Sequence, residues 1–124
     1  MAIFRIVDPI YIPVRDLENS RRWYGEKLDC HQMKGIKNEP GTIIFQTDPE
    51  EGTLIIGLPD DKNPASFEAS PAVPTLFTDH IEKAHSLLHS RGVAPGAVQR
   101  DRQGTRYFEI RDLDGNLLEI SEEP

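Results

Sequence analysis

Alternation of apolar and polar residues predicts strands in both halves of the chain. The last such run is Leu117–Ser121. Its period of two places Leu118 and Ile120 on one face and Glu119 on the other. The run before it is Thr105–Arg111, and the Asp-Gly-Asn between them tolerates the positive φ angles of a tight turn. We therefore expect a β-hairpin, with the carboxylate of Glu119 in the middle of its otherwise apolar second strand.

The pattern predicts the same order of elements in each half. The first half should contain a strand, a helix and two more strands: Ile6–Val14, Leu17–Leu28, Gly41–Thr47 and Thr53–Leu58. The second half should contain the strand Val73–Phe77, a helix at about His80–Arg91 and the hairpin. Asp16 can cap the first helix. Asp79 and Glu82 resemble a capping box before the second helix, which Gly92 would end.

We interpret this recurrence as an internal duplication. The helices overlay at an offset of about 64 residues, and Gly52–Ile56 overlays Gly115–Glu119 at 63. Residues 1–124 would form one domain, with a first module at about 1–59, a polar connector at about 60–71 and a second module at about 72–124. Neither module can bury a sheet face alone, so the two must pack together. Pro9 and Pro13 remove backbone donors, which favours an edge position for the first strand.

Composition and charge narrow the possible partners. The net charge of −7 argues against nucleic acid or an anionic membrane surface, which require a basic face. The single cysteine, Cys30, excludes an internal disulfide framework and favours a reducing compartment. We find neither a leader pattern nor a long apolar run, and therefore expect a cytoplasmic protein without a membrane segment.

Three stretches carry a family resemblance: Val14–Ser20 with Trp23, Tyr24 and Leu28 after it, then Asp79–Gly92, then Asp112–Ile120. In these residues the sequence resembles the vicinal oxygen chelate superfamily. Its members include glyoxalase I, extradiol dioxygenases, fosfomycin-resistance proteins and bleomycin-resistance proteins. The resemblance covers nearly the whole chain. It implies an α+β fold of two βαβββ modules whose mixed sheets curl around a cleft, commonly in a homodimer.

The resemblance also implies where a metal ion would bind. Catalytic members hold a divalent metal with one ligand from the first and one from the last strand of each module. The matching positions here are Pro9, Ile56, Val73 and Glu119. Three of these residues have no donor atom, whereas a divalent metal usually needs three or four protein ligands. We therefore expect no metal cofactor.

Strand alternation independently gives the residues that would line the cleft. The candidate ligand-binding residues are Tyr11, Phe77, Tyr107, Glu109, Arg111 and Glu119. If the hairpin pairs symmetrically about Asp114, Glu109 lies directly across from Glu119. Such a carboxylate pair needs compensation, which Arg111, a shared proton, or a bound cation or metal could supply. This mixture of aromatic, apolar and a few polar groups is typical of a small-molecule pocket.

Other sequence features favour structural roles. His85 and His89 are spaced i, i+4 on the second predicted helix, a spacing that can bind zinc, but no third ligand accompanies them in a recognisable pattern. We expect them at the surface or half-buried. Neither a glycine-rich phosphate loop nor a Gly-x-Ser-x-Gly elbow occurs, so nucleotide binding and serine hydrolysis have no support.

Three hypotheses for function follow. The first is metal-independent binding of a small organic ligand in an aromatic, partly acidic cleft of a bleomycin-resistance-like homodimer. The second is an enzyme of the same superfamily, a lyase, isomerase or dioxygenase-like protein, with an atypical metal site or none and with Glu119 as catalytic base. The third is an interaction module without chemistry. The apolar residues at the metal positions favour binding over catalysis.

Overall fold

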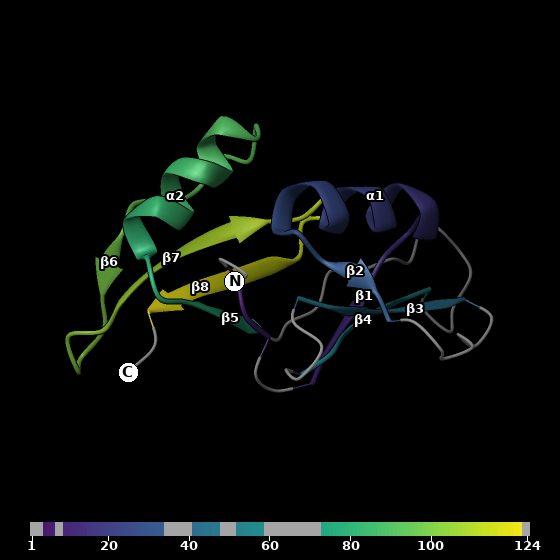
Figure 1. The fold of residues 1–124 in the computed structure, drawn as a ribbon, viewed down its shortest axis with the longest axis horizontal. Coiled ribbons are helices and arrows are strands. Elements are labelled where there is room, and N and C mark those ends of the chain that lie inside the picture. The colour runs from purple at the N-terminus through teal and green to yellow at the C-terminus, as the bar shows by residue number, and fades with distance from the viewer. Residues whose placement is uncertain (1–3, 7–8, 34–40, 48–51, 59–72, 123–124) are drawn as a thin grey trace.

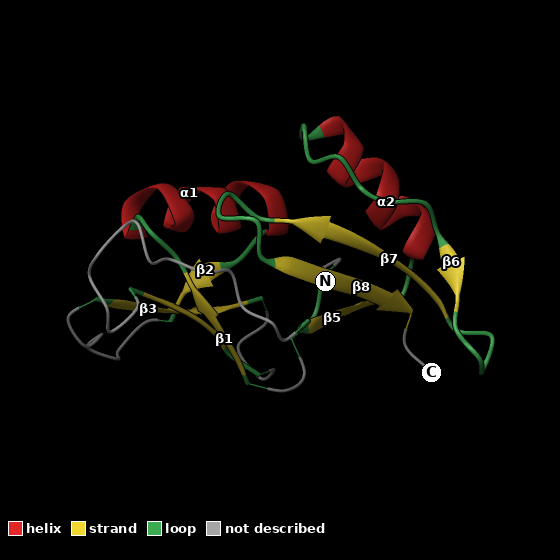
Figure 2. Cartoon of the chain, turned by 180° about the vertical axis from the view of Figure 1, so that it is seen from behind, coloured by secondary structure: helices red, strands yellow, loops and turns green. Residues whose placement is uncertain are grey.

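The computed structural model describes residues 4–6, 9–33, 41–47, 52–58 and 73–122, which contain two helices and two four-stranded sheets. Both helices lie on the same side of the two sheets, as Figure 1 and the opposite view in Figure 2 show. The predicted connector at about 60–71 lies outside the described residues. Within those residues, neither helix has the length and apolar character needed to cross a membrane.

The first half forms one sheet and one helix. Its elements are β1 (Ile10–Pro13), α1 (Leu17–Leu28), β2 (His31–Gln32), β3 (Thr42–Gln46) and β4 (Leu54–Gly57). The strand order is β1-β4-β3-β2, with β1 parallel to β4 and the other pairs antiparallel. Strand β1 lies at the edge of this sheet, as its prolines predicted. Strand β2 was not predicted, because its two exposed polar residues have no apolar alternation.

The second half repeats this topology. Its elements are β5 (Thr75–Thr78), α2 (Ile81–Ser90), β6 (Gln99–Arg100), β7 (Arg106–Arg111) and β8 (Leu117–Glu122), and the strand order is β5-β8-β7-β6. Strands β5 and β8 are parallel, as β1 and β4 are. The fold class predicted from the sequence, two βαβββ modules with mixed sheets, is therefore confirmed. The missed strand β6 is again a pair of exposed polar residues.

The two helices begin differently. The side chain of Asp16 accepts a hydrogen bond from the backbone N–H of Asn19 at 2.9 Å, so the predicted cap of α1 is confirmed. The predicted capping box of α2 is wrong, because the N-cap residue is His80 and its side chain makes no capping bond. The Asp79 and Glu82 carboxylates instead form ion pairs with Arg5 at 3.9 Å and Arg106 at 3.1 Å.

A short N-terminal segment connects the two halves. The backbone of Arg5 exchanges two hydrogen bonds with Phe77 of β5, at 2.7 and 2.8 Å. The next residue, Ile6, accepts a bond from the backbone N–H of Gly52, which precedes β4. Phe4 and Ile6 are both completely buried. Residues 4–6 therefore join the second sheet to the end of the first, and they add apolar surface to the shared core.

The core fills the space between the helices and the sheets. Side chains alternate along each strand, and the positions that face the helices are buried; in the final strand these are Leu118 and Ile120, as predicted. The α1 aromatic pair also lies in this core: Tyr24 packs edge-on against Trp23 and stacks on Phe45 of β3. The opposite faces of the sheets contain the half-exposed residues considered below.

A buried carboxylate joins the modules. Asp112, at the start of the β7–β8 turn, accepts four hydrogen bonds of 2.7–2.9 Å. Its Oδ1 accepts from the backbone N–H groups of Asp114 and Asn116. Its Oδ2 accepts from the hydroxyl of Tyr24 on α1 and from the side chain of Asn116. That Asn116 amide also donates to the carbonyl of Pro13 in β1 at 2.8 Å, so the turn of the second module is fixed to the first.

The chain contains a second, exposed copy of this turn. The residues Arg-Asp-x-x-Gly occur at 100–104 and again at 111–115. In the exposed copy, Oδ1 of Asp101 accepts from the backbone N–H groups of Gln103 and Thr105, as Oδ1 of Asp112 does in its own turn. In both copies the arginine donates to the glycine carbonyl. The two turns thus share local geometry but differ in burial, which makes one a control for the other.

The buried turn should be far more sensitive to substitution than the exposed one. Each carboxylate oxygen of Asp112 accepts two hydrogen bonds. In Asp112→Asn, an amide nitrogen would replace one of these oxygens and would face buried donors that it cannot accept from. We expect a loss of about 1–3 kcal/mol in the free energy of unfolding. Asp101→Asn keeps its accepting oxygen and should cost less than about 0.5 kcal/mol. Urea unfolding of both variants checks this, and equal losses would contradict the role given to Asp112.

The single cysteine predicts an alkaline limit on stability. Cys30 is buried after α1, and desolvation, helped by the nearby Asp29 carboxylate, raises the pKa of its thiol from 9.0 to about 12. Between these values the unfolded chain has lost a proton that the folded chain retains. Stability should therefore fall as pH rises from 9 to 12, by up to about 1.4 kcal/mol per pH unit. Chemical unfolding across this range should show a weaker dependence in Cys30→Ala; an unchanged slope would contradict the assignment.

Candidate functional site

Five of the six predicted ligand-binding residues lie on one face of the second sheet. Arg111 pairs with Leu117 at the turn end of β7 and β8. Strand pairing aligns the other four in two neighbouring rows across β5, β8 and β7: Phe77, Ser121 and Tyr107 in one, and Thr75, Glu119 and Glu109 in the other. Their neighbours Leu76, Phe108 and Ile120 point to the opposite side and are completely buried. The face away from the helices therefore presents two aromatic rings next to two carboxylates. We call these four residues, with Thr75, the acidic–aromatic face.

The predicted carboxylate pair is present. Glu109 is the register partner of Glu119 in the antiparallel β7–β8 pair, and both side chains are half-buried. The hydroxyl of Thr75 donates to Oε2 of Glu119 at 3.2 Å, which orients that carboxylate from the neighbouring strand. Like charges directly opposite on one face destabilise a strand pair unless something compensates. This arrangement is therefore suited to a positively charged group.

Arg111 does not supply that compensation in the structure. Its guanidinium donates to the carbonyl of Gly115, across the β7–β8 turn, at 3.0 Å. Among the residues described, no ion pair joins Arg111 to Glu109 or Glu119. The reason is local, because the same arginine-to-glycine bond forms in the exposed turn at 100–104. The compensation by Arg111 that the sequence suggested is therefore not formed among these residues.

Tyr11 lies on the other sheet. It belongs to β1, pairs with Ile55 of β4 and is 55 % exposed, whereas its neighbours Ile10 and Ile12 are buried. Its ring lies over Gly57, where an added Cβ would come within 2.6 Å of the tyrosine hydroxyl. Gly57 thus makes room for the ring. Sequence reasoning did not identify Gly57, although a glycine inside a strand is a known sign of close approach.

The register corrects one of the four positions matched to the family's metal ligands. Tyr11 pairs with Ile55, and Thr75 pairs with Glu119. The residue equivalent to Glu119 in the first module is therefore Ile55, at an offset of 64. The predicted match, Ile56, is completely buried among the core residues on the helix side. The offset of 63 used for that match was wrong by one residue, which reverses the face of a strand.

The corrected positions still offer few donor atoms. Pro9 and Val73 are exposed just before β1 and β5, and Ile55 is apolar. In the part of the chain that the structure describes, no group of three or more His, Cys, Asp or Glu side chains is arranged to hold a metal ion. Of the two i, i+4 histidines, His89 is exposed. His85 is half-buried, with its ring edge-on to Phe108 and Nε2 at 2.9 Å from the carbonyl oxygen of Gly96.

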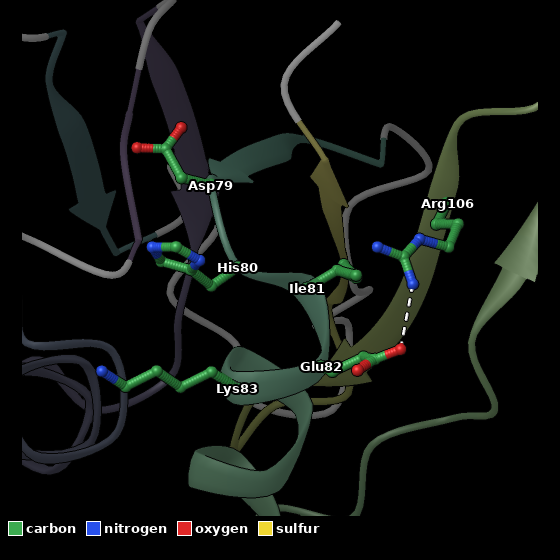
Figure 3. Close-up of a pocket in the computed structure, with 6 residues that line it drawn as sticks. All are labelled: Asp79, His80, Ile81, Glu82, Lys83 and Arg106. Carbon is green, nitrogen blue, oxygen red and sulfur yellow. Dashed lines mark hydrogen bonds and ion pairs between the residues drawn. The ribbon is translucent and has the colours of Figure 1, made fainter.

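A hollow of about 280 Å³ lies at the start of α2, away from the predicted site. Figure 3 shows its lining residues, with Arg106 turned toward Glu82. The Arg106 guanidinium also binds the Glu122 carboxylate at 2.6 Å, and this contact lowers the pKa of Glu122. Asp79, on the same rim, pairs with Arg5. Several charged groups that line the hollow thus already form ion pairs. We therefore interpret these groups as an ionic connection between α2 and the second sheet.

Solved structures with the same fold are known. One is a member of the glyoxalase/bleomycin resistance protein/dioxygenase superfamily from Sphaerobacter thermophilus. It has a TM-score of 0.73 and 23 % identity, with coverage of 94 % of this chain and 96 % of that one. The bleomycin resistance determinant encoded on transposon Tn5 has a TM-score of 0.72 and 19 % identity, with coverage of 93 % of this chain and 95 % of that one. TnmS3, an antibiotic-binding protein from Streptomyces sp. CB03234, has a TM-score of 0.71 and 20 % identity, with coverage of 95 % of each chain.

A family comparison agrees with these likenesses. No curated protein matches the sequence significantly. The model of the Glyoxalase/Bleomycin resistance protein/Dioxygenase superfamily, however, matches residues 6–120. This match runs from the buried N-terminal segment to Ile120, a completely buried residue of β8. The chain therefore belongs to the glyoxalase/bleomycin resistance protein/dioxygenase superfamily.

Proposed function

We propose that this protein binds a small organic ligand on the acidic–aromatic face, without a metal ion. The observation that carries the proposal is the direct opposition of Glu109 and Glu119 beside the rings of Phe77 and Tyr107. Aromatic surface supplies most of the contact area in small-molecule sites, and a few polar groups fix orientation. The matched metal positions, by contrast, offer too few donor atoms for a divalent ion.

The ligand that best suits this face is a flat or bulky aromatic cation. Two half-buried carboxylates repel each other, and a positive group between them would relieve that repulsion. Rings on the same face can also attract a cation through their quadrupoles. Two structures of the same fold, the Tn5 bleomycin resistance determinant and the antibiotic-binding protein TnmS3, are named for drug resistance or antibiotic binding. These names support a binding role for the present chain.

The same proposal includes a homodimer in the cytoplasm. Dimers are common in the family that the sequence resembles, and a buried single thiol suits a reducing compartment. The open faces of both sheets would then be available to shape the ligand site between or within chains. Sedimentation equilibrium of the purified protein tests the dimer, and a single species of monomer mass at micromolar concentration would contradict it.

An enzymatic role is the second candidate, and one contact favours it. The Thr75 hydroxyl bond fixes the Glu119 carboxylate, as a catalytic base requires. In this case Glu119 would take a proton from a small carbonyl or epoxide substrate, with Glu109 or Tyr107 assisting. Glu119→Gln would then abolish turnover and leave folding unchanged. Ligand binding without turnover by the wild-type protein would favour the first candidate.

Calorimetric titration with matched probes tests the binding proposal. We expect the aromatic cation ethidium to bind and the neutral phenanthridine, which has the same fused three-ring core, to bind more weakly. Glu119→Gln should weaken ethidium binding about tenfold or more, because a charge-assisted contact contributes about 1.5–3 kcal/mol. Glu26→Gln is the control, since Glu26 is exposed on α1 and the substitution removes the same charge.

Two results would contradict this prediction. One is the absence of heat from ethidium and from a wider panel of aromatic cations, with the fold shown intact by circular dichroism. The other is an equal loss of affinity in Glu26→Gln and Glu119→Gln, which would indicate that only the net charge of the protein matters.

A further inference from the structure

The C-terminal ends of the two helices contact each other through a reciprocal pair of hydrogen bonds. Nζ of Lys27, in the last turn of α1, donates to the carbonyl of Arg91 at 2.5 Å. Nη1 of Arg91, the C-cap residue of α2, donates to the carbonyl of Lys27 at 2.9 Å. Each residue is therefore both donor and acceptor to the other. We call this pair the helix-end clasp.

The clasp satisfies groups that helix geometry leaves open. The last carbonyls of an α-helix have no partner within the helix, and they form its negative end. Two such ends placed together repel each other and leave acceptors unmatched. In the clasp, each cation lies at the negative end of the opposite helix and binds one of its terminal carbonyls. The clasp thus turns an unfavourable meeting of helix ends into a favourable one.

The two residues occupy equivalent places in the duplicated modules. Lys27 and Arg91 are 64 residues apart. The same interval separates the helix N-caps Asp16 and His80. It also separates the paired strand positions, since Tyr11 with Ile55 corresponds to Thr75 with Glu119. A contact in which two equivalent residues bind each other in the same way is the mark of a two-fold interface.

Three other contacts between the modules are not repeated by the residues 64 positions away. The residue 64 positions after Tyr24 is Leu88, which has no hydroxyl to repeat the bond to Asp112. The residue 64 positions before Asn116 is Gly52, which has no side-chain amide to repeat the bond to Pro13. Beside the clasp, Arg91 also forms an ion pair with Asp29 at 3.2 Å. The residue equivalent to Asp29 is Val93, which has no carboxylate to repeat this ion pair.

We propose that Lys27 and Arg91 form a positioning clasp that sets the angle between the two halves. The clasp also sets the shape of the ligand site, a consequence that rests on the proposed function, because each half supplies one open sheet face. Lys27 and Arg91 act through the helices and touch no ligand. They are positioning residues.

A distance measurement between the helices tests the clasp without a ligand. In a Cys30→Ala background, spin labels at Asn19 on α1 and Ser86 on α2, both exposed, report the separation of the helices by double electron–electron resonance. Lys27→Met with Arg91→Met removes both donors and keeps similar chain length. We expect a shifted and clearly broader distance distribution. The exchanged pair, Lys27→Arg with Arg91→Lys, should restore the wild-type distribution, because equivalent positions can trade residues.

Arg106→Met is the matched control. It removes a guanidinium that links α2 to β8 within the second module, through Glu82 and Glu122. It should lower stability without changing the distance between the helices. An unchanged distribution in the double methionine variant would overturn the positioning role. An exchanged pair as broad as the double methionine variant would overturn the two-fold equivalence. Failure of the ligand proposal would appear separately, as absent heat from the wild-type protein.

Discussion

The buried carboxylate of Asp112 is the contact on which the arrangement of this protein depends. A buried charge is tolerated only where hydrogen bonds replace the water it has lost, and Asp112 has four such bonds. Two of these bonds close the β7–β8 turn, and one comes from α1 of the other module. The same turn fixes the register that places Glu109 opposite Glu119. A slip of one residue would turn every side chain of β8 to the other face and dissolve the acidic–aromatic face.

The two modules share one backbone plan but differ in chemistry. Ile55 stands where the second module has Glu119, and Tyr11 stands where it has Thr75. The open face of the first sheet is therefore apolar at the position where the second is acidic. A single carboxylate position cannot replace a metal site that the family builds from both modules. This asymmetry is the physical reason for favouring a binding site over the metal-dependent chemistry of catalytic relatives.

The sequence predicted those parts of the fold that depend on periodic burial. The helix Leu17–Leu28, its cap Asp16 and the register of the final hairpin all follow from alternation, spacing and turn residues. The prediction failed where several partners compete for one side chain. Asp79 binds Arg5 in place of capping α2, and Arg111 binds a turn carbonyl in place of Glu119. Such choices depend on residues far apart in the sequence.

Short or ambiguous signals account for the other misses. Strands β2 and β6 contain two exposed polar residues each, too few to show a period. Ile56 was placed on the wrong face because Leu54, Ile55 and Ile56 form an apolar run without alternation, which suits either register. The reciprocal bonds of Lys27 and Arg91 could not be read from the sequence, since solvated cations at helix ends are common. Only the packing of the modules brings these two residues together.

Metal analysis would show whether the site functions without a metal ion. The protein would be purified without chelators and measured by elemental analysis, both as isolated and after addition of Ni²⁺, Zn²⁺ or Mn²⁺ followed by desalting. We expect well below one metal ion per chain in every sample, because the matched positions offer too few donor atoms. Near-stoichiometric metal that is lost in Glu119→Ala would contradict it and would make the enzymatic role the leading one.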